Sequence, residues 1–243
     1  MRLPTALVVE PAGSTGVGRL GDWLRDAGLL LDVRTGADRP ELGSYAAVVV
    51  MGGPMGAYED EAYPWLPGVR DLLRTAVGAR VPTLGICLGG QLLAGALGGR
   101  TRAGDEGPEI GPGLVAKRDS AAGDPLFGPV PFTPDVLQWH WDVVTELPAG
   151  AALLASSTRY PHQAFRVGDA AWGTQFHIET TPQTVRRWAQ ADADLLARDH
   201  DWDVLAALER WDLERLHADL EDVWRPFAQR FAELARAQEY ARR

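Results

Sequence analysis

The stretch Val81-Pro82-Thr83-Leu84-Gly85-Ile86-Cys87-Leu88-Gly89-Gly90-Gln91 decides how the chain is expected to fold. Residues 81–86 are mostly apolar, which predicts a buried strand. Residues 91–97 then have the composition of a helix. The glycines between the two segments predict a tight turn, with Cys87 where the strand ends.

A cysteine at such a turn has features of a nucleophile. The turn holds the residue in strained backbone geometry and projects its side chain above the sheet edge. Glycine at positions 85 and 89 removes Cβ atoms that would clash there. The partial positive charge of the helix N-terminus favours thiolate over thiol, and the Leu88 N–H points where an oxyanion would form. The alternative is a buried structural cysteine, because free cysteines are commonly buried.

Composition limits the functional classes. The chain has 243 residues, 46% of them hydrophobic, which suffices for one domain with a sizeable core. Its formal charge of −9 and the lack of a basic cluster argue against nucleic acid or an anionic membrane surface as a partner. The single cysteine excludes a disulfide framework and favours a reducing compartment. We expect a cytoplasmic protein, since no apolar run approaches the ~20 residues that span a bilayer.

Strands and helices alternate through the first hundred residues. Apolar runs predict strands at residues 5–9, 29–34 and 46–51, and helical periodicity predicts helices at 20–27 and 66–77. This order predicts a parallel sheet covered by helices on both faces, with the site at the carboxyl ends of the strands. The glycine-rich turn at residues 52–56 would let backbone N–H groups face a ligand. Residues 11–18 lack the lysine and the third glycine of phosphate-binding loops.

The second half is expected to add mixed strands and then helices. Strands are predicted at residues 114–118, 136–144 and 151–156, with loops at 98–113 and 124–134. Residues 164–167 and 170–176 predict a hairpin closed over Gly168-Asp169. Thr181 and Pro182 predict a helix start, and an apolar stripe predicts further helix from residue 204, with Pro226 kinking it or starting a new helix. We expect these helices to pack on the domain or on a second subunit, as in a homodimer.

His177 and Glu179 form the second candidate catalytic segment. They are two residues apart, so on extended backbone they project to the same face. A carboxylate beside an imidazole fixes its tautomer and stabilises the imidazolium, which is the arrangement needed to take a proton from a thiol. The alternative is an ion pair at the surface. Cys87 and His177 are ninety positions apart, so only folding could unite them.

Three stretches together resemble the class I glutamine amidotransferase family, over about residues 1–182. They are Met51-Gly52-Gly53-Pro54, the segment from Gly85 to Gln91, and Gln175-Phe176-His177-Ile178-Glu179. The resemblance implies an α/β, flavodoxin-like fold with a mostly parallel central sheet flanked by helices. It implies an amidotransferase-like domain at residues 1–181, with a C-terminal helical extension at 182–243. The family often has proline where Ile178 stands, but the spacing of the triad is kept.

The resemblance also implies residue roles. Cys87 would attack the side-chain amide of glutamine, His177 would act as base and then acid, and Glu179 would orient His177. The N–H groups of Gly53 and Leu88 would form the oxyanion hole. Residues expected to contact the substrate are Gly52, Gln91, Trp139, His140 and Trp141.

Neither a metal nor an organic cofactor is expected. Asp142 near the pocket and Glu109 in a nearby loop are further candidates for the site.

Three functions remain open from the sequence. The first is a glutaminase-type enzyme that forms a γ-glutamyl thioester and releases ammonia for a separate synthetase partner. The second is a hydrolase or transferase of another γ-glutamyl compound, such as a γ-glutamyl amine, with Trp139 and Trp141 walling a larger leaving group. The third is a non-catalytic binding subunit, although Cys87, His177 and Glu179 are all present.

Overall fold

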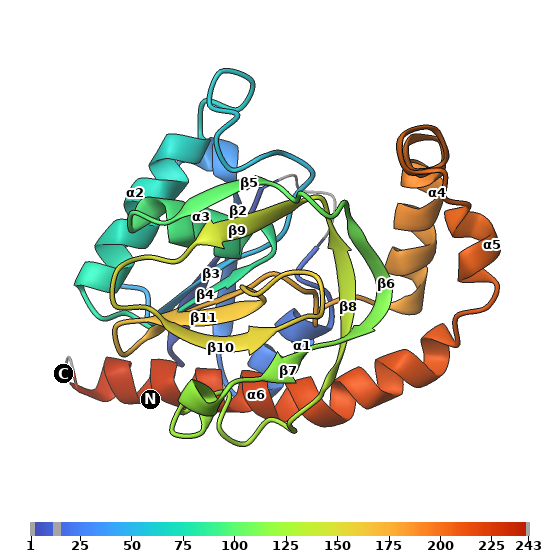
Figure 1. Ribbon diagram of the computed structural model, residues 1–243. Coiled ribbons are helices and arrows are strands. Elements are labelled where there is room, and N and C mark those ends of the chain that lie inside the picture. Colours follow the sequence, from blue (N-terminus) through green and yellow to red (C-terminus); the bar gives the residue numbers. More distant parts are fainter. Residues whose placement is uncertain (1–2, 12–15, 242–243) are drawn as a thin grey trace.

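The central sheet has a parallel part that begins with the N-terminal strands. The computed structural model describes residues 3–11 and 16–241, and within them eight strands form this sheet in the order β2-β1-β3-β4-β12-β11-β10-β7 (Figure 1). The parallel strands are β1 (Thr5–Glu10), β2 (Leu30–Thr35), β3 (Ala47–Val50), β4 (Thr83–Ile86) and β12 (Ala171–Thr174). The predicted mostly parallel sheet is confirmed.

The other edge of the sheet is antiparallel. It consists of β11 (Ala164–Val167), β10 (Ala152–Ser156) and β7 (Ala116–Lys117). β11 and β12 form the hairpin predicted over Gly168-Asp169. The expectation that the second half of the sheet is mixed is therefore confirmed.

Helices cover both faces of the sheet. Alternation along β1 sends Val8 into a buried cluster with α1 (Gly18–Asp26) and α6 (Leu213–Ala241), and sends Leu7 into a second cluster with α2 (Leu66–Gly78) and α3 (Leu88–Ala96). Figure 1 shows α2 and α3 on one side of the central strands and α1 and α6 on the other. Both faces are apolar because both are covered, as parallel sheets require.

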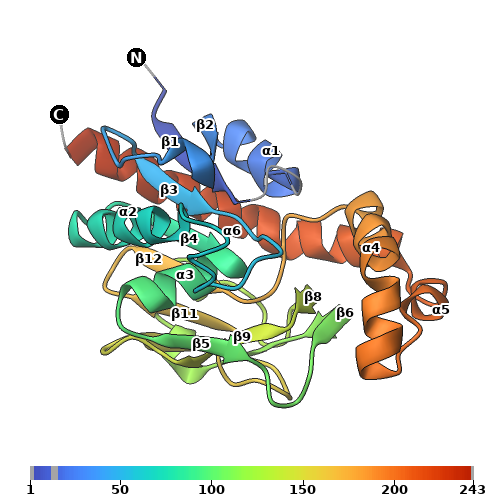
Figure 2. The same ribbon diagram turned by 90° about the horizontal axis from the view of Figure 1, so that it is seen from above.

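The C-terminal region begins with α4 (Pro182–His200) and α5 (Val204–Leu208). Thr181 caps α4 by accepting a hydrogen bond from the Thr184 N–H, as predicted. Figures 1 and 2 show α4 and α5 at one end of the molecule, beside β6 and β8. α6 instead runs along the sheet and shares its core, and the division into residues 1–181 and 182–243 stays a prediction.

The middle of the chain differs from the sequence-based expectation. The predicted loop at residues 98–113 contains β5 (Arg100–Ala103) and the start of β6 (Glu109–Leu114). The predicted strand at 136–144 is two strands, β8 (Asp135–His140) and β9 (Asp142–Glu146). Of the predicted strand at 114–118, residue 114 ends β6 and only residues 116–117 form β7. β5 pairs with β9 and β6 with β8, so partner strands, not local propensity, decide these segments.

A kink or a new helix was predicted at Pro226. Pro226 lies inside α6, so the prediction that a new helix starts there is wrong. A proline within a helix costs about 3 kcal/mol or more. The large side chains of Trp224, Phe227 and Phe231 are fully buried around it, and their burial offsets that cost. The apolar stripe predicted for this region thus packs on the sheet of the same chain.

The predicted loop at residues 11–18 lies partly outside the described residues. Short 3-10 helices occur at Gly36–Asp38 and Asp119–Ala121. Over residues 3–11 and 16–241, no helix combines the length and apolar character needed to cross a membrane.

Candidate active site

Cys87 lies at a strained turn between β4 and α3. Its backbone has φ 50° and ψ −109°, a conformation that costs about 1–3 kcal/mol in a non-glycine residue. The neighbours must be glycine for the turn to form. A Cβ on Gly85 would lie 2.4 Å from the Gly89 carbonyl oxygen, and one on Gly89 would lie 2.0 Å from the Val50 oxygen. The strand, turn and helix predicted around the cysteine are present.

His177 and Glu179 follow the end of β12, the strand beside β4. Nδ1 of His177 lies 2.6 Å from Oε1 of Glu179. The second carboxylate oxygen accepts the N–H of Ile178 at 2.9 Å, which fixes the carboxylate. Both side chains are about 95% buried, so the couple is not an ion pair at the surface. A carboxylate in this position makes Nδ1 the protonated nitrogen of the neutral ring. Nε2 is then unprotonated and can accept a proton.

The ring of His177 lies near Cys87, because a Cβ on Gly52 would come within 3.0 Å of Cε1 of His177 and 3.5 Å of Cβ of Cys87, and both residues line one cavity. Burial disfavours the charged imidazolium, but the Glu179 carboxylate and Cys87 outweigh burial and raise the pKa of His177 well above its ordinary value. The thiol and the imidazole–carboxylate couple, remote in sequence, therefore meet at one edge of the sheet. The arrangement is suited to an imidazolium–thiolate pair.

The glycine turn after β3 lies against the same groups. A Cβ on Gly52 would come within 3.0 Å of Cε1 of His177 and 3.5 Å of Cβ of Cys87. A Cβ on Gly53 would come within 3.1 Å of the Leu88 side chain. Only a residue without a side chain leaves room at these positions, so the backbone of the turn lies close to the reacting groups. Leu88 is the first residue of α3, where N–H groups lack partners within the helix.

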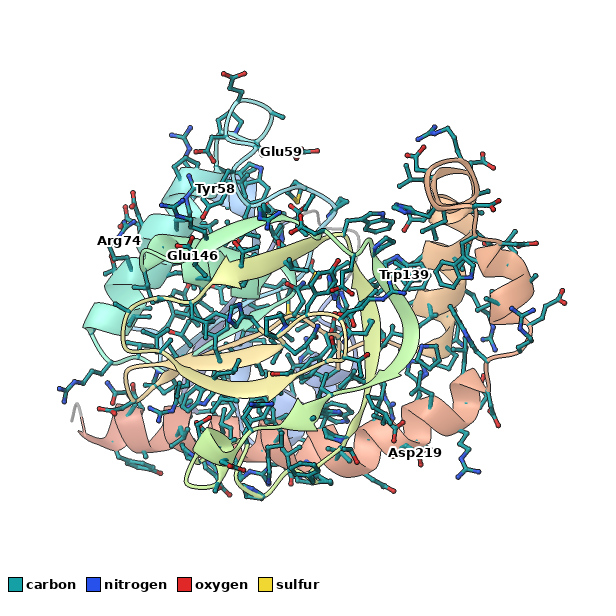
Figure 3. All side chains as sticks on the ribbon, in the orientation of Figure 1. Tyr58, Glu59, Arg74, Trp139, Glu146 and Asp219 are labelled. Atoms are coloured by element: carbon teal, nitrogen blue, oxygen red, sulfur yellow. The ribbon has the colours of Figure 1, made fainter. Side chains whose placement is uncertain are left out.

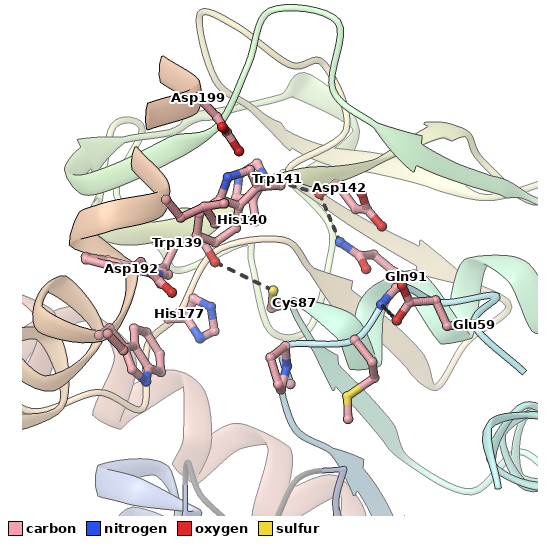
Figure 4. A pocket seen from close by; sticks show the side chains of 18 of the residues that line it. Glu59, Cys87, Gln91, Trp139, His140, Trp141, Asp142, His177, Asp192 and Asp199 are labelled. Atoms are coloured by element: carbon pink, nitrogen blue, oxygen red, sulfur yellow. Dashed lines mark hydrogen bonds between the residues drawn. The ribbon is translucent and has the colours of Figure 1, made fainter. Parts of the chain in front are cut away.

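Two amide side chains and a carbonyl complete the surroundings of the sulfur. Nε2 of Gln175 lies 3.7 Å from Sγ of Cys87. The Trp139 carbonyl oxygen lies 4.0 Å from the same sulfur (Figure 4). Gln91 donates to the Asp142 carbonyl oxygen at 2.9 Å and to Oε1 of Gln175 at 3.3 Å. Gln91, predicted to contact substrate, is thus also bonded to a residue that touches the sulfur.

A cavity of about 590 Å³ opens over Cys87 and His177. Such a volume is within the range of small-molecule sites, roughly 300–1,000 Å³. The predicted residues that line it are Gly52, Gly53, Cys87, Gln91, Trp139, His140, Trp141 and His177. Asp142 lines it as well. Burial, and then the charge of Glu59, raise the pKa of Asp142.

The ring of His140, which lines the cavity, contacts the carboxylate of Glu109, which does not. Nδ1 of His140 lies 3.2 Å from the Asp142 carbonyl oxygen, and burial lowers the pKa of His140. Nε2 lies 3.1 Å from Oε2 of Glu109, and that oxygen also accepts from Gln163 at 2.6 Å. Burial opposes ionisation of Glu109, but its hydrogen bonds with His140 and Ser157 outweigh burial and hold its pKa below the usual value. Glu109 reaches His140 and does not line the cavity.

One wall of the cavity was not predicted from the sequence. It belongs to α4, whose residues Trp188, Ala191, Asp192, Leu195, Asp199 and His200 line the cavity. The Trp188 ring meets the His177 ring edge-on at 4.9 Å, and Nε1 of Trp139 donates to Asp192 at 2.8 Å. Figure 3 shows Trp139 beside α4. The three- and four-residue steps between these positions indicated one helix face, but not that this face lines the site.

Met55, within the turn predicted at residues 52–56, and Glu59, which was not predicted, also line the cavity. Glu59 accepts the N–H of Gly56 at 3.0 Å, which closes its loop locally. Among residues 3–11 and 16–241, no group of three or more His, Cys, Asp or Glu side chains is arranged to hold a metal ion.

The comparisons with known proteins agree with this geometry. The family model described as glutamine amidotransferase class-I matches residues 28–189, which include Cys87, His177 and Glu179. The chain belongs to the class I glutamine amidotransferase family. It is similar to a GMP synthase [glutamine-hydrolyzing] of Thermomicrobium roseum, with 38% identity over 132 residues, or 54% of this chain and 23% of that protein. The chain thus spans less than a third of the curated relatives it matches.

Solved structures of the family match nearly the whole chain. A glutamine amidotransferase from Thermotoga maritima is 32% identical, with a TM-score of 0.82 over 96% of this chain and 100% of that one. A glutamine amido transferase from Methylobacillus flagellatus is 27% identical, with a TM-score of 0.81 over 98% of this chain and 96% of that one. The fold of the family therefore extends to the C-terminal helices that supply the α4 wall.

Proposed function

We propose that this enzyme hydrolyses the side-chain amide of glutamine through Cys87, His177 and Glu179. The observation that carries the proposal is the buried couple of His177 and Glu179 set against Cys87 at a strained turn. A thiolate, a general acid–base and a group that orients it are the components of covalent amide hydrolysis. Membership of the amidotransferase family supports the same reaction.

In the first half of the reaction, the Cys87 thiolate attacks the side-chain carbonyl carbon and a carbon–sulfur bond forms. The carbonyl oxygen becomes an oxyanion, which the N–H groups of Gly53 and Leu88 would stabilise by hydrogen bonds. As the intermediate collapses, the carbon–nitrogen bond breaks and the His177 imidazolium gives its proton to the departing nitrogen. Ammonia leaves, and a γ-glutamyl thioester remains on Cys87.

In the second half, His177 takes a proton from water, whose oxygen attacks the thioester. The carbon–sulfur bond breaks, glutamate leaves, and the thiolate is restored. Glu179 stabilises the imidazolium in both halves and is not itself protonated. Gly52, Gln91 and the segment Trp139-His140-Trp141 would hold the amino-acid end of the substrate, which their position around the cavity supports.

The ammonia would pass to a separate acceptor enzyme in the cytoplasm. The matching curated relatives are named GMP synthase [glutamine-hydrolyzing], and the chain corresponds to less than a third of their length. We infer that a synthetase acting in trans is the partner. A homodimer is a further part of this proposal, and sedimentation of the purified chain tests it.

The test is release of ammonia and glutamate from glutamine by the purified protein, alone and with candidate synthetases. Turnover should disappear in Cys87→Ala. Absence of glutamine hydrolysis by the intact protein in every mixture, together with no γ-glutamyl thioester in quenched reactions, would contradict the proposal.

A second candidate is hydrolysis of a γ-glutamyl amine by the same groups. The observation in its favour is the α4 wall, where the rings of Trp188 and Trp139 contact each other, with centroids 5.7 Å apart, and both line the cavity. The cavity of about 590 Å³ offers room for a leaving group larger than ammonia. A panel of γ-glutamyl amines separates the candidates, because preference for glutamine by orders of magnitude would exclude the second.

A further inference from the structure

The sulfur of Cys87 has two hydrogen-bond neighbours besides His177, and they favour opposite protonation states. The Trp139 carbonyl oxygen, 4.0 Å away, can only accept, so it favours the neutral thiol, which has a proton to donate. The side-chain amide of Gln175, 3.7 Å away through Nε2, can only donate from that nitrogen. A donor to sulfur favours the thiolate, because hydrogen bonds to the charged form stabilise it.

The orientation of the Gln175 amide is fixed by a second glutamine. Nε2 of Gln91 has two N–H groups, of which one bonds the Asp142 carbonyl oxygen at 2.9 Å and the other bonds Oε1 of Gln175 at 3.3 Å. Because Oε1 of Gln175 accepts from Gln91, its Nε2 is turned towards Cys87. Both glutamines are 3% exposed, so bulk water does not compete strongly for these groups.

We propose that Gln175 is a catalytic residue that donates a hydrogen bond to the Cys87 thiolate, and that Gln91 is the positioning residue that turns the Gln175 amide towards the sulfur. The chain of bonds runs from the Asp142 carbonyl through two amides to the sulfur. It links β9, α3 and the end of β12, so packing of these elements sets the reactivity of Cys87. The role rests on the proposed use of Cys87 as a nucleophile, but it concerns the sulfur and not the identity of the substrate.

The test is the pH dependence of alkylation of Cys87 by iodoacetamide. The sequence contains one cysteine, so the reaction reports one site. Gln175→Leu removes the donor and leaves Gln91 bonded to Asp142. The midpoint of its alkylation profile should rise by about one pH unit, which is about tenfold less thiolate on the acid side of the profile. Glutamine hydrolysis should fall by a similar factor in kcat with little change in KM.

Two further variants should shift the alkylation midpoint by different amounts. Gln175→Glu has the same shape but directs a carboxylate oxygen at the sulfur, so its midpoint should rise further than that of Gln175→Leu. Gln91→Leu leaves Gln175 in place without its partner, so its midpoint should lie between the wild type and Gln175→Leu. The other titratable groups around the site stay in place in all variants: His177, Glu179, His140, Asp142, Glu59, Asp192 and Asp199.

Gln138 provides the matched control. It is another buried glutamine whose Nε2 donates to the side chain of a second one, Gln163, at 2.9 Å, but it does not touch Cys87. Gln138→Leu should leave the alkylation midpoint within about 0.2 pH units of wild type. That is a small fraction of the shift expected when a hydrogen bond to the thiolate is lost. Thermal unfolding of each variant shows whether it is folded at the temperature of the alkylation assay.

An unchanged midpoint in folded Gln175→Leu, or an equal shift in Gln138→Leu, would overturn the inference while wild-type glutamine hydrolysis keeps the proposed function. If wild type does not hydrolyse glutamine but the ordered shifts occur, the proposed function fails and the role of Gln175 at the sulfur stands.

Discussion

The cavity has two unlike walls. The wall on the sheet side carries Cys87, His177 and Gln91, all buried and each bonded to another fixed group. The wall on α4 carries Asp192, half-buried, and the exposed Asp199 and His200. A hydrogen bond from Trp139 to Asp192 ties the α4 wall to the sheet side.

From this difference we expect the sheet-side wall to carry out the chemistry and the α4 wall to select the substrate. Groups that move protons and hold an oxyanion need fixed positions, and burial within a bonded network provides them. A wall that selects the substrate can be built from side chains with fewer restraints. We expect substitutions on the sheet side to lower kcat strongly, and substitutions on α4 to act mainly on KM and on the choice of substrate.

The largest effect is expected on the sheet side, at the nucleophile. Cys87→Ala should lower kcat for glutamine by about 10⁴-fold or more, as loss of a nucleophile does in other hydrolases. Its thermal stability should be near that of wild type, since alanine fits the same turn with a smaller side chain. A steady-state assay of glutamate release measures the effect, and residual activity above a few per cent would remove Cys87 from the chemistry.

The next effect should come from the residue that orients the base. Glu179→Gln should lower kcat by roughly 10²–10⁴-fold. Glu179 raises the pKa of His177, so the wild-type alkaline limb, where the imidazolium is lost, should lie well above pH 6.5. Without the carboxylate, burial lowers that pKa, and the alkaline limb should move to lower pH. A pH–rate profile tests the sign, and a limb that stays fixed would contradict this role.

On the α4 wall, Trp188→Ala removes the edge contact with the His177 ring and the contact with Trp139. Aromatic pairs contribute about 0.5–1.5 kcal/mol, so KM should rise by about threefold to tenfold while kcat changes less. Trp202→Ala is the matched control, because Trp202 pairs with Trp211 and does not line the cavity. A fall in kcat as large as that of Glu179→Gln would contradict the expectation that substitutions on α4 act mainly on KM.

The smallest effect is expected behind the cavity. Glu109→Gln keeps an acceptor for His140 but loses the charge, so kcat/KM should fall by about twofold to fivefold, the range of a modest hydrogen-bond change. Steady-state kinetics beside the exposed variant Glu146→Gln measures it. A fall in kcat/KM of more than a hundredfold would contradict a role limited to holding His140 and would indicate that Glu109 takes part in the reaction directly.

The sequence predicted the sheet side much better than the α4 wall. The turn at Cys87 depends on local glycines, and His177 and Glu179 are two residues apart, so local patterns sufficed. Trp188 lies on the helix whose start Thr181 and Pro182 predicted. That this residue would meet Trp139 and His177 depends on tertiary packing, which a local pattern does not contain.

Two other outcomes have the same cause. The glycine- and proline-rich segment at residues 98–113 has low strand propensity, and β5 and β6 form because β9 and β8 supply partners. Gln175 stands in a recognisable stretch, but the aim of its amide depends on Gln91, eighty-four positions away. Such contacts become visible only when the folded chain brings the residues together.

The central claim is that Cys87 and His177 act as one unit, and a glutamine-analogue electrophile tests it most directly. Mass spectrometry after treatment should find one adduct, on Cys87, whose formation excess glutamine suppresses. His177→Ala, checked for folding by its unfolding temperature, should slow that adduct by at least about 10²-fold, the contribution of a general base. Labelling at an equal rate in His177→Ala, or a wild-type chain that remains unlabelled, would contradict the account.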